Sequence, residues 1–256
     1  MQDHRRIAVA GATGRVGRHV VDVLEERGHD AVPMSRSQGV DVITGSGLAD
    51  ALAGVDWVID VATGPSPEQG PATEFFTTAA RNLQEAGERA GVGRIVAVSI
   101  IGCDRFAGGY GAAKVAHERA TLSGPVPARV LRAAQFHEFV AQLLDWGRQG
   151  DVVYVPKMRT QLVAARAVAE ALVDLAAADA PASGHTIPEI AGPREESLAD
   201  AARLLAARRH DPVKIQVVSD PADPDREVYE SGALLPGPQA TLAGPTFEEW
   251  LDAAAP

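Results

Sequence analysis

Short apolar runs alternate with amphipathic helical patterns along the first half of the chain. The runs that predict strands are residues 7–10, 31–34, 56–62, 94–99 and 128–131, and the patterns that predict helices are residues 16–27, 48–53, 75–90 and 110–122. Gly28, Gly54 and Gly91 follow three of these helices, and glycine readily ends a helix. Apolar strands separated by helices indicate βαβ units with right-handed crossovers. We therefore expect an α/β protein built on a doubly wound parallel sheet.

The pattern changes beyond residue 133. The predicted helices are residues 136–147, 166–178, 198–209 and 247–254, and the predicted strands are residues 152–155, 185–190 and 213–218. Residues 220–245 are rich in Pro, Gly and Asp, which predicts an extended loop. We expect residues 1–132 to form the core. Residues 133–256 should complete the sheet and form a small lobe, all within one integrated domain.

The charge of the chain restricts its partners. The 256 residues include 34 acidic and 24 basic side chains, and the net charge of −10 opposes binding to a nucleic-acid backbone. The single cysteine, Cys103, excludes an internal disulfide, the N-terminus has no secretory apolar region, and charged residues interrupt the longest apolar stretch. We expect a cytoplasmic protein, a monomer or small homo-oligomer, with no nucleic-acid or membrane partner. Any anionic ligand must then be held by a few local donors.

A glycine-rich turn supplies such donors directly after the first predicted strand. Its residues are Gly11, Ala12, Thr13, Gly14, Arg15, Val16 and Gly17. The first glycine permits a tight turn, the second lets a pyrophosphate approach the backbone, and the third allows close packing of helix and strand. The N–H groups and dipole at the start of the following helix favour the diphosphate. The arrangement predicts a Rossmann-type fold that binds a dinucleotide.

The residues after the second predicted strand bear on which dinucleotide is bound. An acidic residue about 20 positions after the glycine turn would bind the ribose 2′-hydroxyl of NAD, but this chain has Ser35, Arg36 and Ser37 there. Arg36 can pair with a 2′-phosphate, and the two serines can add donors. We expect NADP(H) as the cofactor and regard NAD(H) as the less favoured alternative.

A tyrosine and a lysine lie four residues apart on a predicted helix. Tyr110 and Lys114 share one helical face, and a nearby ammonium group would lower the pKa of the phenol. Such a tyrosine could donate a proton to a carbonyl oxygen that receives a hydride. Ser99, at the end of the fourth predicted strand, could donate a second hydrogen bond to that oxygen. We expect these three residues to be catalytic.

Taken together, these features resemble the short-chain dehydrogenase/reductase superfamily and, within it, the atypical NmrA-like branch. The matching phrases are Gly11-Ala-Thr-Gly14-x-x-Gly17, Ala53-Gly-Val-Asp56, Ala90-Gly-Val-Gly-Arg-Ile-Val, Val130-Leu-Arg-Ala-Ala-Gln-Phe136 and Ile190-Ala-Gly-Pro193. The resemblance implies that Ala62, Thr63 and Gly64 line the cofactor. It also implies that Ser99 and Lys114 contact it, and that Lys114 holds the nicotinamide ribose.

The resemblance places the substrate pocket after the fifth predicted strand. The candidate substrate-binding residues are Gln135, Phe136, His137 and Trp146. The histidines are scattered and have no metal-ligand spacing, so we expect no metal.

The leading hypothesis is an NADP-dependent reductase of a carbonyl or quinone group in a small organic substrate. Many members of the NmrA-like branch lack a working Tyr/Lys pair, which leaves a non-catalytic NADP redox sensor as one alternative. A nicotinamide-dependent epimerase or dehydratase is the other.

Overall fold

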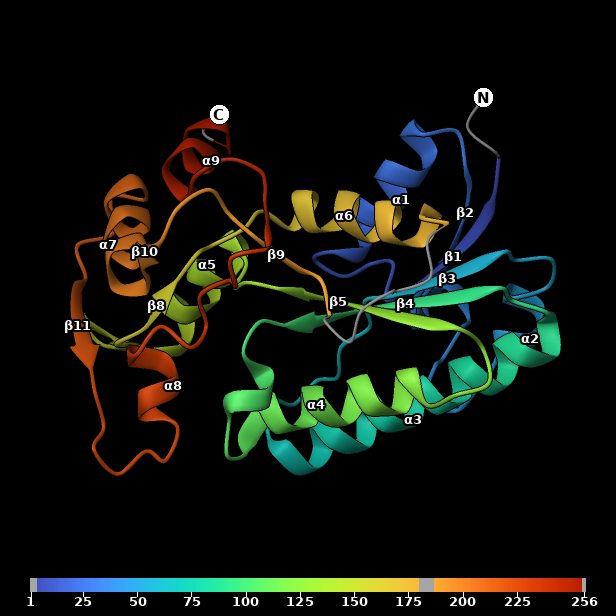
Figure 1. Ribbon diagram of the computed structural model, residues 1–256. Helices are drawn as coiled ribbons and strands as arrows, with labels where there is room; N and C mark the ends of the chain where they lie inside the picture. Colours follow the sequence, from blue (N-terminus) through green and yellow to red (C-terminus); the bar gives the residue numbers. More distant parts are fainter. Residues whose placement is uncertain (1–3, 180–186, 255–256) are drawn as a thin grey trace.

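A seven-stranded parallel sheet forms the centre of the computed structural model, which describes residues 4–179 and 187–254 (Figure 1). In spatial order the strands are β2 (Asp30–Met34), β1 (Arg6–Ala10), β3 (Trp57–Asp60), β4 (Arg94–Ile100), β5 (Ala128–Ala133), β9 (Glu189–Ala191) and β12 (Thr241–Leu242). The order reverses at β1, which pairs with β2 on one side and with β3 on the other. The predicted doubly wound parallel sheet is confirmed, and its switch point lies at the carboxyl ends of β1 and β3.

Helices cover both faces of this sheet. Helices α1 (Gly17–Glu26) and α6 (Ala165–Ala177) lie above it in Figure 1, and α3 (Gln69–Ala90) and α4 (Gly109–Leu122) lie below it. In β1, Ile7 and Val9 join the apolar cluster under α1 and α6, whereas Ala8 and Ala10 join the cluster with Leu83 of α3. Because alternate residues of one strand are buried on opposite faces, the strand is apolar throughout.

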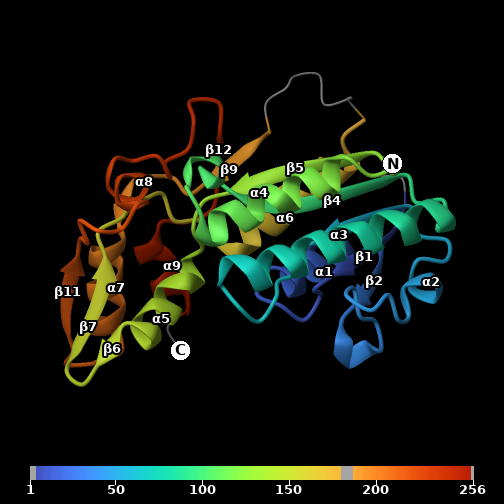
Figure 2. The same ribbon diagram turned by 90° about the horizontal axis from the view of Figure 1, so that it is seen from below.

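A lobe lies at one end of the sheet (Figures 1 and 2). Its elements are α5 (His137–Trp146), β6 (Arg148–Gln149), β7 (Val152–Pro156), β8 (Arg159–Thr160), β10 (Glu196–Ser197), α7 (Leu198–Arg208), β11 (Lys214–Val218), α8 (Arg226–Glu230) and α9 (Phe247–Ala254). Strands β6, β7 and β11 form a mixed sheet, and β8 pairs with β10. Leu144 of α5, Val153 of β7 and Leu205 of α7 share one apolar cluster, so the lobe has a core of its own.

Three elements depart from the predicted boundaries. Helix α3 begins at Gln69 instead of residue 75, because its first three residues, Gln69 to Pro71, are exposed and show no apolar period. The predicted loop 220–245 contains α8 and β12, two elements too short to leave a periodic pattern. Strand β9 begins at Glu189, and positions 185 and 186 of the predicted strand lie outside the described residues.

Short connecting helices complete the main part of the fold. They are α2 (Leu48–Ala51) and the single 3-10 turns η1 (Arg36–Gln38) and η2 (Cys103–Arg105). No helix in residues 4–179 and 187–254 is both long and apolar enough to cross a membrane.

A buried glutamine joins α3 to the loop between α4 and β5. Gln84 is 2% exposed, and its Nε2 donates to the carbonyl oxygens of Thr121 (2.7 Å) and Val126 (3.2 Å). Its Oε1 accepts from the N–H of Val126 at 2.8 Å. A Cβ on Gly124 would lie 2.2 Å from Cδ of Gln84, so the loop folds directly over the amide. The side chain therefore satisfies backbone groups that this loop buries.

We predict that Gln84→Leu lowers the free energy of unfolding by about 2–4 kcal/mol, because it leaves these buried backbone groups without partners. Urea denaturation followed by circular dichroism measures the change. The exposed Gln239 provides a matched control, since Gln239→Leu makes the same chemical change at the surface. Equal unfolding midpoints for the two variants would contradict the prediction.

Candidate functional site

The glycine-rich turn joins β1 to α1 by close contacts between backbone atoms. Gly11 has a φ of +80°, and the carbonyl oxygen of Met34 accepts hydrogen bonds from Gly11 N (3.0 Å) and Ala12 N (3.3 Å). A Cβ on Gly11 would lie 2.8 Å from Cα of Ala62, and one on Gly17 would lie 2.1 Å from the carbonyl oxygen of Gly11. Both positions therefore require glycine.

The turn also presents free donors at the start of α1. Thr13, Gly14 and Arg15 are exposed, and the N–H groups of Thr13 and Arg15 have no acceptor among the described residues. They lie beside the positive end of the α1 dipole. These features fit the diphosphate of a dinucleotide, whose oxygens would accept from the free N–H groups.

The segment after β2 meets the chemical requirement for a 2′-phosphate. Ser35 Oγ lies 2.9 Å from Ser37 Oγ and 2.7 Å from Gln38 Oε1. Arg36 begins the η1 turn and is exposed, and its guanidinium has no hydrogen-bond or ion-pair partner in the part of the chain that the structure describes. Because β2 lies next to β1, this arginine follows the strand adjacent to the glycine turn.

The loop after β3 forms the opposite wall. Ala62 packs against Gly11, and its N–H donates to Asp60 Oδ1 at 3.0 Å. A Cβ on Gly64 would lie 2.9 Å from Cγ of Phe75, which places this loop against the beginning of α3. The residues expected from the resemblance to line a cofactor, Ala62, Thr63 and Gly64, thus lie at the same sheet edge as the glycine turn.

Tyr110 extends to this loop from the first turn of α4. Its hydroxyl shares a hydrogen bond of 3.2 Å with Thr63 Oγ1, and its ring meets Phe76 edge-on, with 5.7 Å between centroids. Burial raises the pKa of Tyr110, and the hydrogen bond to Thr63 opposes this effect only in part. The phenol therefore keeps its proton at neutral pH.

Lys114 does not act on Tyr110 as the sequence predicted. Its Nζ turns into the core, where it donates to the carbonyl oxygen of Val98 and to His117 Nδ1, each at 2.8 Å, and lies 4.3 Å from the ring centroid of Phe76. The side chain is 4% exposed, and burial lowers its pKa to about 8. The expectation of a lowered pKa for Tyr110 is wrong, because burial acts on that phenol and the ammonium is bound elsewhere. The contact of Lys114 with the nicotinamide ribose that the resemblance implies stays a prediction.

Ser99 contacts Cys103 and not Tyr110. It is 2% exposed, and its Oγ lies 3.7 Å from Cys103 Sγ, which in turn donates to Glu118 Oε1 at 3.3 Å. Burial raises the pKa of Cys103 to about 11, so this thiol stays protonated. The hydroxyl that contacts Tyr110 belongs to Thr63, for which the resemblance implies a place beside the cofactor only. A hydroxyl residue three positions after the end of β3 was the signal in the sequence that could have indicated this contact.

The four expected substrate residues do not converge on one cavity. Gln135 Oε1 accepts from Thr160 Oγ1, and Phe136 packs against the main core. His137 is fully buried, its Nε2 contacts the carbonyl oxygen of Pro245 at 3.1 Å, and its ring lies 5.4 Å from the rings of both Phe247 and Trp250. Trp146 is 61% exposed on the surface. Helix α9 therefore covers His137 in this structure, and the substrate role expected of this residue stays a prediction.

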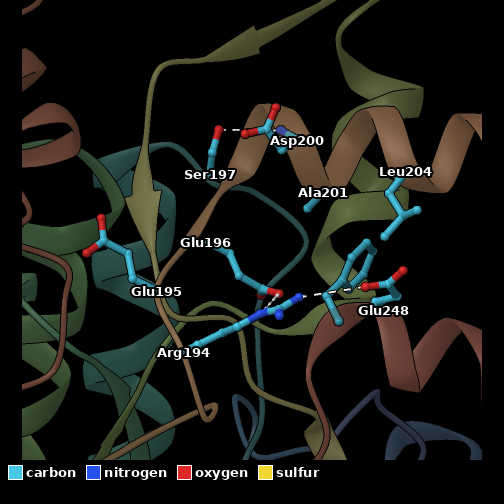
Figure 3. Close-up of a pocket in the computed structure, with 9 residues that line it drawn as sticks. Arg194, Glu195, Glu196, Ser197, Asp200, Ala201, Leu204 and Glu248 are labelled. Carbon is cyan, nitrogen blue, oxygen red and sulfur yellow. Dashed lines mark hydrogen bonds and ion pairs between the residues drawn. The ribbon is translucent and has the colours of Figure 1, made fainter.

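Two cavities lie in the lobe. One of about 290 Å³ lies between β10, α7 and α9, with Arg194 between Glu196 and Glu248 (Figure 3). The other, of about 270 Å³, is lined by residues of α5, β7, β11, α8 and the loops beside them, among them Phe139, Met158, Arg226 and Tyr229. The ring of Tyr229 meets Phe106 edge-on at 5.4 Å, and Phe106 packs on Gly111, the residue after Tyr110. The second cavity therefore borders the segment that leads into the α4 site.

Comparisons with known proteins agree with this geometry. Residues 11–134 match a family described as NAD(P)H-binding. No curated protein sequence matches the chain. Among solved structures, MoeE5 in complex with UDP-glucuronic acid and NAD superposes with a TM-score of 0.71 at 18% identity, over 98% of this chain and 100% of that one.

Two further structures show the same fold. A GDP-mannoheptose C4 reductase from Campylobacter jejuni with NADP bound has a TM-score of 0.65 at 16% identity, over 85% of this chain and 88% of that one. A short-chain dehydrogenase/reductase superfamily protein from Agrobacterium tumefaciens with bound NAD has a TM-score of 0.65 at 19% identity, over 97% of this chain and 95% of that one. At these identities the likeness concerns the fold.

Taken together, the family matched over residues 11–134 and the shared fold confirm the predicted Rossmann-type dinucleotide-binding fold, which a short-chain dehydrogenase/reductase superfamily protein also has. They also confirm the predicted class of cofactor, a nicotinamide dinucleotide. Assignment to the NmrA-like branch and the preference for NADP stay predictions.

The burial of His137 predicts a pH-dependent stability. Burial lowers its pKa to about 4 from 6.5, so between these values the unfolded chain binds a proton that the folded chain excludes. Stability is therefore present above pH 6.5 and is lost as the pH falls towards 4, by up to about 3 kcal/mol from this group.

Urea titrations at several pH values should show that His137→Phe is less sensitive to this acid range than the parent protein. The exposed His210 provides the control variant His210→Asn, because its φ of +54° suits asparagine. In this control the free energy of unfolding should depend on pH as it does in the parent protein. If His137→Phe lost stability with acid as steeply as the parent protein does, the lowered pKa of His137 would be refuted as the cause.

Proposed function

We propose that this protein is an NADP(H)-dependent oxidoreductase that reduces a carbonyl or quinone group of a small organic molecule. The observation that carries the proposal is the Tyr110 hydroxyl, held by Thr63 at the carboxyl end of β3, beside the glycine turn. A protonated phenol at the edge where a nicotinamide dinucleotide binds is the donor that carbonyl reduction needs.

The chain itself supplies the binding groups and the proton. The segment from Gly11 to Gly17 would hold the diphosphate, Ser35, Arg36 and Ser37 the 2′-phosphate, and Ala62 to Gly64 the wall next to the reacting end. When bound, the reduced nicotinamide supplies a hydride. Tyr110 donates its proton to the substrate oxygen that gains negative charge. The exposed Thr63 hydroxyl orients the phenol and can relay a proton to it from solvent water, taking up one proton as it gives up another.

Tyr110→Phe should lower kcat/KM for NADPH-dependent reduction by about 100-fold or more, because it removes the proton donor and keeps the ring against Phe76. The assay follows NADPH absorbance with a panel of ketones, aldehydes, quinones and nucleotide sugars. The Kd for NADPH should stay unchanged. Tyr154→Phe, in β7 of the lobe, is the matched control. Full turnover in Tyr110→Phe on a carbonyl substrate would reject the assignment.

Arg36→Ala should weaken NADPH binding by about 10- to 100-fold, because a charge-assisted pair with the 2′-phosphate is lost. The Kd for NADH, which lacks this phosphate, should change little. Fluorescence titration measures both constants, and Arg81→Ala on the exposed side of α3 is the control. Equal losses for NADPH and NADH would show that Arg36 does not select the phosphate.

Two other functions would use the same dinucleotide site. An epimerase or dehydratase would return the hydride to its substrate, so product would form without net consumption of NADPH. A redox sensor would discriminate oxidised from reduced cofactor and turn over no substrate. Product analysis by mass spectrometry, run beside the absorbance assay, separates the three.

A further inference from the structure

Three polar side chains form a continuous buried chain between β3 and α4. Asp60 Oδ2 lies 3.1 Å from His117 Nε2, and His117 Nδ1 lies 2.8 Å from Lys114 Nζ. The three residues are 2%, 1% and 4% exposed, respectively. Phe76 stacks on the imidazole at 4.8 Å and also lies under the ammonium group, which shields the chain from solvent.

The donors and acceptors of this chain allow one arrangement of hydrogens. A carboxylate only accepts, so Nε2 of His117 carries the hydrogen that is donated to Asp60. Nδ1 is then free to accept from the ammonium of Lys114. Burial and the neighbouring Lys114 lower the pKa of His117, which keeps the ring neutral. The buried chain therefore holds one negative charge on Asp60 and one positive charge on Lys114.

The same carboxylate holds the wall of the dinucleotide site. Asp60 Oδ1 accepts from the N–H of Ala62, and Ala62 is the residue against which Gly11 packs. Lys114 is tied in turn to the carbonyl oxygen of Val98 in β4. The polar chain thus connects the backbone that borders the glycine turn to helix α4, which carries Tyr110.

We propose that Asp60, His117 and Lys114 are positioning residues for the loop after β3. Asp60 holds the loop directly, Lys114 acts on it through His117 and Asp60, and loss of the Lys114 proton weakens dinucleotide binding. The inference rests on the nicotinamide-dinucleotide site of the proposed function, and it does not depend on the reaction. A neutral Lys114 would leave the buried Asp60 carboxylate without its counter-charge and add negative potential beside a site for an anionic cofactor.

The other titratable groups around Lys114 do not provide a replacement charge. Besides Asp60 and His117, Glu118 on α4 and Cys103 in η2 face it. Glu118 is paired with Arg132 of β5, at 2.9 Å and 2.8 Å, and Cys103 stays neutral because burial raises its pKa. The pKa of Lys114 is lowered to about 8, so its proton is lost within an accessible pH range.

The first test measures the Kd for NADPH by fluorescence from pH 6.5 to 9.5. The Kd should rise about fivefold or more as the pH passes 8, and by linkage bound cofactor should raise the pKa of Lys114. Lys114→Met and Asp60→Asn should bind more weakly at pH 7 and lose this pH dependence. Lys214→Met, which removes an exposed lysine in β11, should keep the parental profile.

Variants of His117 separate positioning from simple packing. His117→Gln keeps an acceptor for Lys114 and a donor for Asp60, so it should retain the pH profile. His117→Phe keeps the stacking on Phe76 and breaks the chain, so it should lose the profile. If the Kd for NADPH depended on pH equally in His117→Gln and His117→Phe, the proposal would be overturned.

An NMR measurement on the free protein requires no variant and no turnover. Nitrogen-15 spectra should show His117 as the neutral Nε2–H form at pH 7, and a charged ring or an Nδ1–H form would overturn the proposal. A flat pH profile of NADPH binding in the parent protein would also overturn it while leaving the proposed function intact. Absence of any dinucleotide binding would overturn both.

Discussion

The approach of the Gly11 backbone to Ala62 is the contact on which the rest of the site depends. A Cβ on Gly11 would lie 2.8 Å from Cα of Ala62, so the turn after β1 can pack against the loop after β3 only with glycine at this position. That packing lets α1 begin at the switch in strand order, directly after the free N–H groups of Thr13 and Arg15. It also sets the position of Thr63, and through Thr63 the position of the Tyr110 hydroxyl. The N–H groups that can bind an anion and the Tyr110 hydroxyl that can donate a proton therefore both depend on this one backbone contact.

Helix α4 differs from the other helices on the sheet in what it buries. Lys114, His117 and Glu118 lie on its inner face, and each is matched by a partner on a strand: Val98, Asp60 and Arg132 respectively. Buried charges are tolerated only in such pairs, because an unpaired one pays the full cost of desolvation. The helix thus contacts the sheet through a network of specific hydrogen bonds at the end of the sheet that carries the site. This network links the geometry of the loop after β3 to the protonation of a buried amine.

The spacing of Tyr110 and Lys114 placed them correctly on one helix, but it did not determine their partners. A lysine side chain is long enough to turn inward, and here the carbonyl oxygen of Val98 and the His117 ring bind its ammonium. Ser99 precedes the end of β4 and faces the core, whereas Thr63 follows β3 and reaches the surface. Asp60 and His117 lie 57 residues apart and belong to no motif, so only the paired strand and helix bring them together.

The sequence by itself determined the parallel sheet, most of its strands and helices, and the dinucleotide turn. These features depend on local rules: apolar runs form the buried strands, glycine permits the turn, and a helix dipole follows it. Tertiary structure decided which secondary structure the short or exposed segments adopt and which residues they cover. Residues 241–242 form a strand because β9 offers a free edge, α8 lies in a segment with no apolar period, and α9 buries His137. It also decided the protonation of the site, because the pKa of a side chain depends on burial and on neighbours that the order of residues does not reveal.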